Sequence, residues 1–349
     1  MTLRGAISGF GAVAVHAHLP GWLSRRGINI VAIHDPAAAR RHHAINLIKN
    51  VRVYDDLELM LDGEKLDFLD IASPPAFHAG AAQLALEANV HVIVEKPLCL
   101  NATELAQLSS LAARNHRLLM CVHNWKYSPA YRRAHELISA GRLGQAQHVS
   151  LVRMRGEPAG SSPSEVGSGE RWRLDSKAGG GILIDHGWHT FYLANWLMGG
   201  DKPLSVSANL RFDPDSGIDN FADLRIEFPG GRMVNILLMW GAPVRRTAAV
   251  IVGTAGLLDI EGDKILLTEW PGQSADCSVT DIPEDSYHAP WFTAAAADYE
   301  RVLNQGPHAE LARVNLHEAA TALTLTMAAQ RSAAQDGRAV ALNIPGQLE

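Results

Sequence analysis

The sequence predicts an α/β fold in two parts, a doubly wound parallel sheet followed by an α+β unit with a large, mostly antiparallel open sheet. Strand and helix patterns alternate through residues 1–123, and this alternation stops near residue 124. Strand patterns then recur without intervening helices over residues 203–282. Alternating strands and helices build a parallel sheet, whereas consecutive strands pair antiparallel. We therefore expect two domains, residues 1–123 and residues 124–349.

The first predicted strand, residues 3–8, runs directly into a glycine-rich turn that opens a helical pattern reaching to about residue 26. The six residues of the turn are Gly9, Phe10, Gly11, Ala12, Val13 and Ala14. In a G-x-G-x-x-A turn the first glycine permits the tight bend, and the second lets the backbone approach a pyrophosphate. The helix N-terminus adds free N–H groups and the positive end of its dipole. This turn predicts a dinucleotide-binding, Rossmann-type domain.

A second predicted strand, residues 28–34, ends at Asp35, which lies 24 residues after Gly11. In dinucleotide-binding folds an acid at this place hydrogen-bonds the adenosine ribose, and its charge disfavours the 2′-phosphate of NADP. We therefore predict NAD as the cofactor. NADP stays an alternative because Arg40 and Arg41 follow closely, and Asp35 could also simply open a turn.

Four further strands complete the predicted parallel sheet, at residues 51–54, 67–73, 90–95 and 117–123. The carboxyl ends of such strands line one crevice, which is where doubly wound sheets bind their ligands. Ser73 and Pro74 follow one of these strands, and Glu95 and Lys96 follow another. Lys96, fixed in place by Pro97, could orient a substrate hydroxyl and share in its proton transfer. A solvated lysine at a strand end is the structural alternative.

The second part opens with a predicted helix at residues 128–140 and a predicted strand at 145–155. Residues 157–168 are rich in Gly, Ser and Pro and predict a loop. Further predicted strands lie at residues 205–212, 222–228, 233–240, 248–252 and 265–269, and closing helices at 290–305 and 310–335.

The segment 179–195, GGGILIDHGWHTFYLAN, carries the candidate chemistry. Asp185 and His189 are four residues apart, so on a helix they would share one face. A carboxylate beside an imidazole orients the ring and raises its basicity, which makes this pair a candidate proton acceptor for an alcohol. A capping aspartate and a core histidine are the structural alternatives. Trp125, Trp172 and Trp188 lie near these segments and could stack on sugar rings or fill the core.

Composition excludes several classes of protein. The chain has 349 residues, a net charge of -6 and an isoelectric point near 6.2, which argues against nucleic-acid partners. No apolar run approaches the roughly 20 residues of a membrane span, and the start of the chain lacks a signal-peptide pattern. The cysteines Cys99, Cys121 and Cys277 are too scattered for a disulfide framework. We expect a cytoplasmic protein with no membrane partner, and the histidine spacings predict no catalytic metal.

The residues that follow resemble landmarks of the Gfo/Idh/MocA oxidoreductases, named for glucose–fructose oxidoreductase, inositol dehydrogenase and a rhizopine-catabolism protein. They run in the family's order over nearly the whole chain. The landmarks are the turn at residues 9–14, Asp35, Ser73-Pro74-Pro75 with His78, Glu95-Lys96-Pro97, Trp172-Arg173, the glycines at 179–181 leading to Asp185 and His189, and the turn at 253–256.

The resemblance implies hydride transfer between NAD(P) and a hydroxyl or keto group of a sugar, sugar derivative or cyclitol. It implies that Lys96 contacts substrate and cofactor and that His189, paired with Asp185, is the general base. Expected cofactor contacts are Gly9, Phe10, Gly11, Ala12, Val13, Asp35, Ser73, Pro74, His78, Glu95 and Lys96. Expected substrate contacts are Lys126, Tyr127, Trp172, Arg173, Asp185 and His189. The open sheet is expected to join a homodimer or homotetramer.

Two departures from the family pattern leave the substrate open. Lys126 stands where many members carry arginine, so the planar fork that suits a carboxylate is absent there. His186 and Trp188 are unusual residues inside the D-x-G-x-H motif. Two other functions stay open on the same scaffold. One is a redox-neutral lyase or glycosidase that uses bound NAD transiently, and the other is a non-catalytic sensor of a nucleotide or sugar.

Overall fold

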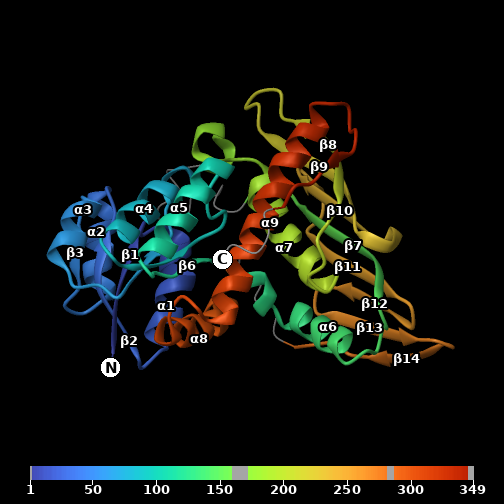
Figure 1. Cartoon of the computed structure of the whole chain (residues 1–349), viewed down its shortest axis with the longest axis horizontal. Helices are drawn as coiled ribbons and strands as arrows, with labels where there is room; N and C mark the ends of the chain where they lie inside the picture. Colours follow the sequence, from blue (N-terminus) through green and yellow to red (C-terminus); the bar gives the residue numbers. More distant parts are fainter. Residues whose placement is uncertain (1, 159–171, 281–286, 345–349) are drawn as a thin grey trace.

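The computed structural model describes residues 2–158, 172–280 and 287–344. Two sheets stand side by side in this structure, with helices covering the first and filling the space between the two (Figure 1). The loop predicted at 157–168 lies outside the described residues from residue 159 onward.

The first sheet is parallel and has the strand order β3-β2-β1-β4-β5-β6. Its strands are β1 (Leu3–Ser8), β2 (Ile28–His34), β3 (Arg52–Tyr54), β4 (Phe68–Ile71), β5 (His91–Val94) and β6 (Leu119–Cys121). All six predicted strands are thus present. The order reverses direction between β1 and β4, so a ligand crevice opens beyond the carboxyl ends of these two strands.

Helices connect the strands of this sheet. They are α1 (Leu19–Leu23), α2 (Ala38–Leu47), α3 (Leu57–Gly63), α4 (His78–Glu87) and α5 (Ala102–Arg114), and a π-helical turn, Ala14–His18, leads into α1. Asn101 caps α5 by accepting the Glu104 N–H at 2.9 Å. The sequence did not predict α2, because only Ala44 of this helix is fully buried and the apolar periodicity is correspondingly weak.

The second sheet is open and has the order β14-β13-β12-β11-β7-β10-β9-β8-β15. Its strands are β7 (Ala146–Arg155), β8 (Ser205–Phe212), β9 (Asp219–Glu227), β10 (Met233–Trp240), β11 (Arg246–Gly253), β12 (Gly256–Glu261), β13 (Lys264–Glu269), β14 (Gln273–Asp276) and β15 (Val340–Ala341). Only β7 and β10 pair in parallel, so the predicted mostly antiparallel sheet is confirmed. The sequence did not predict β12, β14 or β15.

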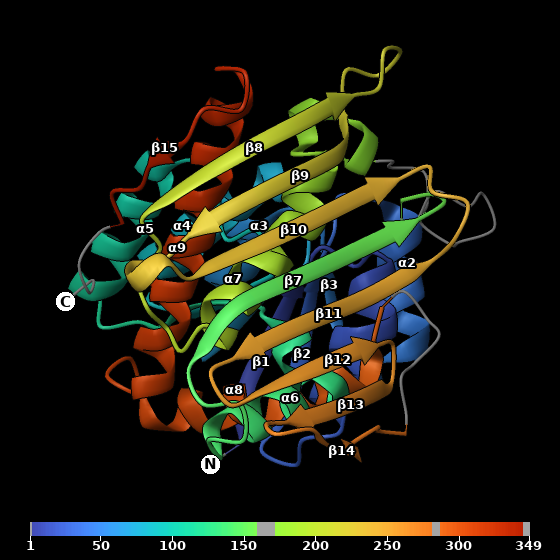
Figure 2. The ribbon, with the colours of Figure 1, turned by 90° about the vertical axis from the view of Figure 1, so that its right-hand side faces the viewer.

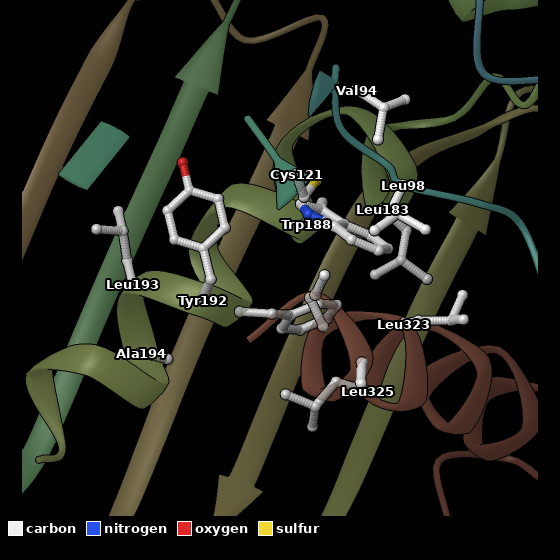
Figure 3. Close-up of a cluster of buried hydrophobic side chains, with 14 of the residues drawn as sticks. Val94, Leu98, Cys121, Leu183, Trp188, Tyr192, Leu193, Ala194, Leu323 and Leu325 are labelled. Atoms are coloured by element: carbon white, nitrogen blue, oxygen red, sulfur yellow. The ribbon is translucent and has the colours of Figure 1, made fainter. Parts of the chain in front are cut away.

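One face of the second sheet carries helices, and the other faces outward (Figure 2). The inner face packs against α7 (Trp188–Leu197) and α9 (Glu310–Ala333), with α6 (Pro129–Ser139) beside them. Figure 3 shows part of this core, which includes Trp188, Leu183, Leu323 of α9 and Val94 of β5. The main core therefore joins the two sheets, which fixes their relative position.

Helix α8 (Ala289–Gln305) packs against the first unit rather than the second sheet. Its Phe292 lies edge-on to Trp22 of α1 at 5.6 Å between ring centroids, and Tyr299 shares the same buried cluster. The predicted boundary after residue 123 assigns α8 to the second domain, whereas its packing places it with the first. No helix within the described ranges has the length and apolar character needed to cross a membrane.

Candidate functional site

A cavity of about 1050 Å³ lies where the two units meet. Its walls come from the turns after β1, β2, β4 and β5 and, in the second unit, from β7 and the start of α7. The predicted site residues that line it are Gly9, Gly11, Ala12, Val13, Asp35, Ser73, Pro74, Glu95, Lys96, Trp172, Arg173 and His189. Five predicted site residues do not line the cavity: Phe10, His78, Lys126, Tyr127 and Asp185.

The turn after β1 requires glycine at one position and leaves room at another. Gly9 has a φ of +87°, and a Cβ there would lie 2.5 Å from the Ser73 nitrogen, so only glycine fits. A Cβ on Gly11 would meet nothing within 4 Å. Its bare backbone therefore faces open space at the start of a helix, which is the arrangement that binds pyrophosphate.

Asp35 holds this turn against the end of β2. Its Oδ2 accepts the Phe10 N–H at 2.8 Å and its Oδ1 accepts the Ala37 N–H at 2.8 Å. The Phe10 side chain itself is buried in the core. The Oγ of Ser73 is buried and has no hydrogen-bond partner among the residues that the structure describes. A bare glycine backbone, a carboxylate at the end of β2 and an unpaired hydroxyl together fit an adenine dinucleotide.

His78 does not contact the cavity, contrary to its predicted cofactor role. Its ring is fully buried, with Nδ1 2.6 Å from the Pro97 carbonyl oxygen and Nε2 2.7 Å from that of Ser73. The ring therefore ties the turn after β5 to the turn after β4. Burial lowers the pKa of His78 from its ordinary value. Its role in this structure is to position the two turns that form the cavity wall.

Lys96 and Asp185 meet at the cavity. The Lys96 Nζ donates to Asp185 Oδ1 at 2.7 Å and to the Asp185 carbonyl oxygen at 2.8 Å. Arg173 Nε donates to the other carboxylate oxygen at 3.1 Å. Burial alone would raise the pKa of Asp185, but Arg173 and Lys96 outweigh it and hold this pKa well below its usual range. The aspartate is therefore ionised and shared between two cations.

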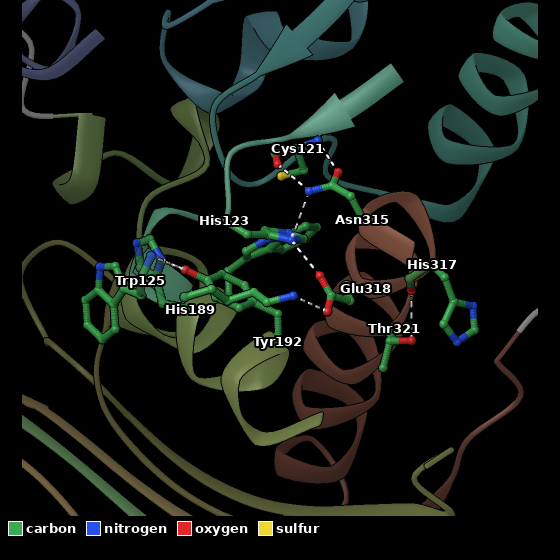
Figure 4. Close-up of polar contacts among 11 residues, drawn as sticks. Cys121, His123, Trp125, His189, Tyr192, Asn315, His317, Glu318 and Thr321 are labelled. Carbon is green, nitrogen blue, oxygen red and sulfur yellow. Dashed lines mark hydrogen bonds and ion pairs between the residues drawn. The ribbon is translucent and has the colours of Figure 1, made fainter. Parts of the chain in front are cut away.

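His189 is buried beside this group, but Asp185 is not its hydrogen-bond partner. Its Nδ1 lies 2.8 Å from the Tyr192 hydroxyl, and its ring stacks on that of Trp125 with 4.4 Å between the ring centroids (Figure 4). The predicted pairing assumed α-helical spacing, whereas residues Leu183–Gly187 form a π-helical turn. The wider π turn changes which residues share a face. Burial, followed by the charge of Lys96, lowers the pKa of His189 well below its ordinary value.

Lys126 and Tyr127 point away from the cavity. The Lys126 Nζ lies 2.6 Å from Glu318 Oε1 on α9, and the Tyr127 hydroxyl donates to Asp298 at 2.8 Å. His123 joins the same group through its Nδ1, 3.3 Å from Glu318. The sequence could not reveal this partner, because Glu318 is 192 residues away along the chain. Neither residue lines the cavity in this structure, and their substrate contacts stay predictions.

A second buried network, which the sequence did not reveal, supports the turn that carries Lys96. His18 is fully buried, with Nδ1 2.8 Å from Asp70 and Nε2 3.1 Å from Glu95. Glu95 in turn accepts the Lys96 N–H at 2.9 Å. Burial alone would lower the pKa of His18, but the two carboxylates outweigh it and raise this pKa to about 9. The ring therefore carries a charge that binds Glu95 in place.

Three more residues of the second unit contribute to the site without having been predicted. Arg153 and His186 line the cavity, and Tyr192 lies beneath His189. The alternation Val149, Leu151, Arg153 along β7 is the signal that could have found the arginine, since it occupies a core-facing position. Within the part of the chain that the structure describes, no three His, Cys, Asp or Glu side chains gather as a metal site.

Comparison with known protein families identifies both parts of the chain. Residues 3–123 match the model of the GFO/IDH/MocA oxidoreductase family with its NAD-binding Rossmann fold. Residues 131–259 match the model of the GFO/IDH/MocA C-terminal domain. The chain belongs to the Gfo/Idh/MocA family. It is an NAD-binding oxidoreductase, as the sequence predicted.

Several relatives within this family have named activities. The chain is 28% identical over 212 residues to D-glucoside 3-dehydrogenase of Escherichia coli, covering 59% of this chain and 57% of the relative. It is 26% identical over 260 residues to dTDP-3,4-didehydro-2,6-dideoxy-alpha-D-glucose 3-reductase of Streptomyces violaceoruber, covering 74% and 72%. The solved structure of GenD2 from gentamicin A biosynthesis, in complex with NAD, superposes with a TM-score of 0.81 at 24% identity, covering 98% of this chain and 97% of that one.

Proposed function

We propose that this chain oxidises a hydroxyl, or reduces the corresponding ketone, of a sugar, sugar derivative or cyclitol. The observation that carries the proposal is the ion pair at 2.7 Å between Asp185 and Lys96, because Lys96 lines the same cavity as His189. The cavity is shared by the dinucleotide-binding turn and the second unit. The names of the D-glucoside and dTDP-sugar relatives support a sugar-like substrate.

The cofactor residues are proposed to be those of the first unit that line the cavity. Gly11 would leave room for the pyrophosphate, Asp35 would bind the adenosine ribose, and Ser73 has the unpaired hydroxyl. When bound, NAD supplies the hydride acceptor. The protein supplies the position of the substrate and the path of its hydroxyl proton.

Lys96 is proposed to orient the reacting oxygen. Asp185 fixes its ammonium group from one side, and Trp172 lies 6.0 Å from the Lys96 Nζ on another. An ammonium group held in place donates hydrogen bonds to an oxygen on which negative charge develops. Arg173 shares the Asp185 carboxylate and so keeps the aspartate charged. Together the three residues preset the lysine before substrate arrives.

His189 is proposed to accept the hydroxyl proton at Nε2. This nitrogen has no hydrogen-bond partner among the described residues, and the residue lines the cavity. For Nε2 to accept a proton, Nδ1 must carry the ring proton and donate it to the Tyr192 oxygen. That oxygen also accepts the Trp125 N–H at 3.0 Å, and a hydroxyl oxygen has two lone pairs for these two donors.

We also propose that copies of this chain associate through the outward face of the second sheet. Val152 and Leu237 lie directly opposite each other on β7 and β10, and Val250 of β11 belongs to the same face. All three are half-buried in the single chain. Burying such a face against a second copy removes apolar area from water. Light scattering after size exclusion should give a molar mass that is a multiple of 37.8 kDa. Leu237→Arg should lower this molar mass. A wild-type monomer would contradict the proposal.

The test of the enzymatic proposal is the near-UV absorbance of reduced nicotinamide. Purified protein is mixed with NAD or NADP and a panel of aldoses, glycosides, sugar acids and inositols. A signal with one class of compound supports the proposal and identifies cofactor and substrate. Product that needs NAD but leaves it oxidised would instead indicate redox-neutral chemistry. Nucleotide binding with no product from any compound would count against an enzyme.

A further inference from the structure

We infer that the substrate carries an anionic group, a carboxylate or a phosphate, and that Arg153 binds it. This inference rests on the proposed function, because it concerns the substrate of that same cavity. Arg153 lies on β7, the strand at the middle of the second sheet, where it continues the core-facing series begun by Val149 and Leu151. Only 4% of the residue is exposed, yet it lines the cavity.

Among the described residues, the guanidinium of Arg153 has contacts but no counter-charge. One terminal nitrogen donates to the Val152 carbonyl oxygen at 2.9 Å, and the other donates to the Tyr131 hydroxyl. Its Nε is buried and has no hydrogen-bond partner in the described part of the chain. No carboxylate pairs with it among residues 2–158, 172–280 and 287–344. Burial of an unpaired cation is unfavourable, so this position implies an anion that arrives with the ligand.

Aromatic rings hold the guanidinium in one orientation. Its central carbon lies 4.7 Å from the centroid of the Trp125 ring and 5.3 Å from that of Tyr131. Contacts of this kind restrict the orientation of the guanidinium, whose planar fork suits a carboxylate or a phosphate. An arginine fixed in this way is already positioned to bind an anion before the ligand enters.

The reacting group and this arginine are neighbours through Trp125. His189 stacks on the Trp125 ring at 4.4 Å, and the Arg153 guanidinium lies over the same side chain. A substrate with its hydroxyl at His189 therefore has Arg153 within reach of another substituent on the same small molecule. This arrangement favours an acidic or phosphorylated sugar over a neutral one.

The charges around Asp185 do not neutralise Arg153. Asp185 is already bonded to Lys96 and Arg173. Burial lowers the pKa of the neighbouring His186 to about 3, although the charge of Asp185 opposes this shift. The positive charges of Arg155, Lys96 and Arg173 lower the same pKa further. The cation of Arg153 thus adds to a site where positive charge already disfavours a protonated histidine.

The experiment compares neutral and anionic compounds of the same skeleton. The protein is loaded with NADH, so that no oxidised cofactor is present to accept a hydride, and is titrated calorimetrically with D-glucose, D-gluconate, D-glucuronate and D-glucose 6-phosphate, and with myo-inositol and its 1-phosphate. We expect at least one anion to bind about tenfold tighter than its neutral counterpart. Preference for the carboxylates or for the phosphates then identifies the anionic group.

Variants of Arg153 decide whether that preference depends on this residue. Arg153→Met keeps an unbranched chain without charge and should abolish the preference, whereas Arg153→Lys keeps the charge without the fork and should retain part of it. Arg225→Met is the matched control, because it removes an exposed positive charge that lies on the same sheet. This variant should keep the wild-type preference. Thermal melting and NAD binding confirm that each variant is folded.

Two kinds of result overturn the inference. One is equal binding of neutral and anionic compounds, or no binding of any anion in the set; the other is a preference that survives in Arg153→Met. Failure of the proposed function looks different, because the binding preference is measured without turnover. If a neutral sugar yields reduced NAD and its anionic counterpart reacts no faster, the proposed oxidoreductase function stands and the inferred anionic substrate is wrong.

Discussion

The Lys96 ammonium lies 2.7 Å from the Asp185 carboxylate, and this ion pair joins the two units beside the cavity that Lys96 lines. Lys96 follows β5 of the first sheet, whereas Asp185 lies in the π-helical turn before α7, 89 residues later. Both side chains are nine-tenths buried or more. Because the partners come from different units, the pair fixes the lysine only when the whole chain has folded.

Replacing Asp185 by Asn should lower the stability of the protein as well as its rate of catalysis. The change leaves Lys96 and Arg173 buried without their carboxylate, and loss of one partner of a buried pair costs about 3–5 kcal/mol. Urea unfolding measures this loss. Glu227→Gln, which breaks the exposed pair with Arg225, is the control and should change stability by less than about 1 kcal/mol. Equal effects of the two variants would contradict a buried, structural ion pair.

The pH dependence of alcohol oxidation should reflect the lowered pKa of His189. Above its pKa the ring is neutral and accepts a proton; below it the ring is protonated and cannot. Because burial and then Lys96 lower this pKa, the acid limb of kcat/KM should lie below the ordinary histidine value of 6.5. His189→Gln should remove the limb and lower kcat by about 10²–10⁴-fold. An acid limb above pH 6.5 would argue for another base.

Tyr192→Phe should reduce the rate without weakening NAD binding. The change removes the oxygen that holds His189 Nδ1 at 2.8 Å, so the ring loses the partner that selects its tautomer. A single hydrogen bond of about 1 kcal/mol corresponds to roughly a fivefold decrease in kcat. Tyr127→Phe is the matched control, because that hydroxyl bonds Asp298 away from the cavity. The same decrease in both variants would indicate a general loss of packing.

Gly9→Ala and Gly11→Ala should separate folding from cofactor binding. Alanine at Gly9 must adopt a φ near +87° and meets the Ser73 backbone, so stability falls by at least about 1–2 kcal/mol. Alanine at Gly11 meets no atom within 4 Å, so stability should change by less than about 0.5 kcal/mol. Its methyl group would enter the space for the pyrophosphate, and NAD affinity should fall about tenfold or more. Unchanged NAD affinity in Gly11→Ala would contradict this cofactor position.

The placement of Gly9, Asp35 and Lys96 around one cavity could be predicted because local patterns determine it. Gly9, Asp35 and Lys96 each follow a strand of a parallel sheet, and such strand ends converge on one edge whatever the rest of the chain does. The contacts of Asp185 and His189 in the second unit could not be predicted, because sequence spacing does not show which kind of helix the residues form. A spacing of four positions from Asp185 to His189 implies a shared face only in an α-helix, and the π-helical turn removed that relation.

Partners distant in sequence account for the other differences. Lys126 carries a charge suited to substrate, but Glu318 on α9 binds it instead. His78 belongs to a family landmark, yet its ring nitrogens contact two carbonyl groups behind the cavity. Arg153 could be read as a break in an apolar alternation, although its neighbours Trp125 and Tyr131 are visible only in the folded chain.

The most direct test of the central claim is the steady-state rate of NADH formation by wild type and Lys96→Met on the same substrate. Loss of one preset donor to the reacting oxygen should lower kcat by about 10²–10³-fold. Lys264→Met, on the exposed part of β13, should keep the wild-type rate, and NAD binding should persist in both variants. An undiminished rate in folded, NAD-binding Lys96→Met would contradict the proposed mechanism.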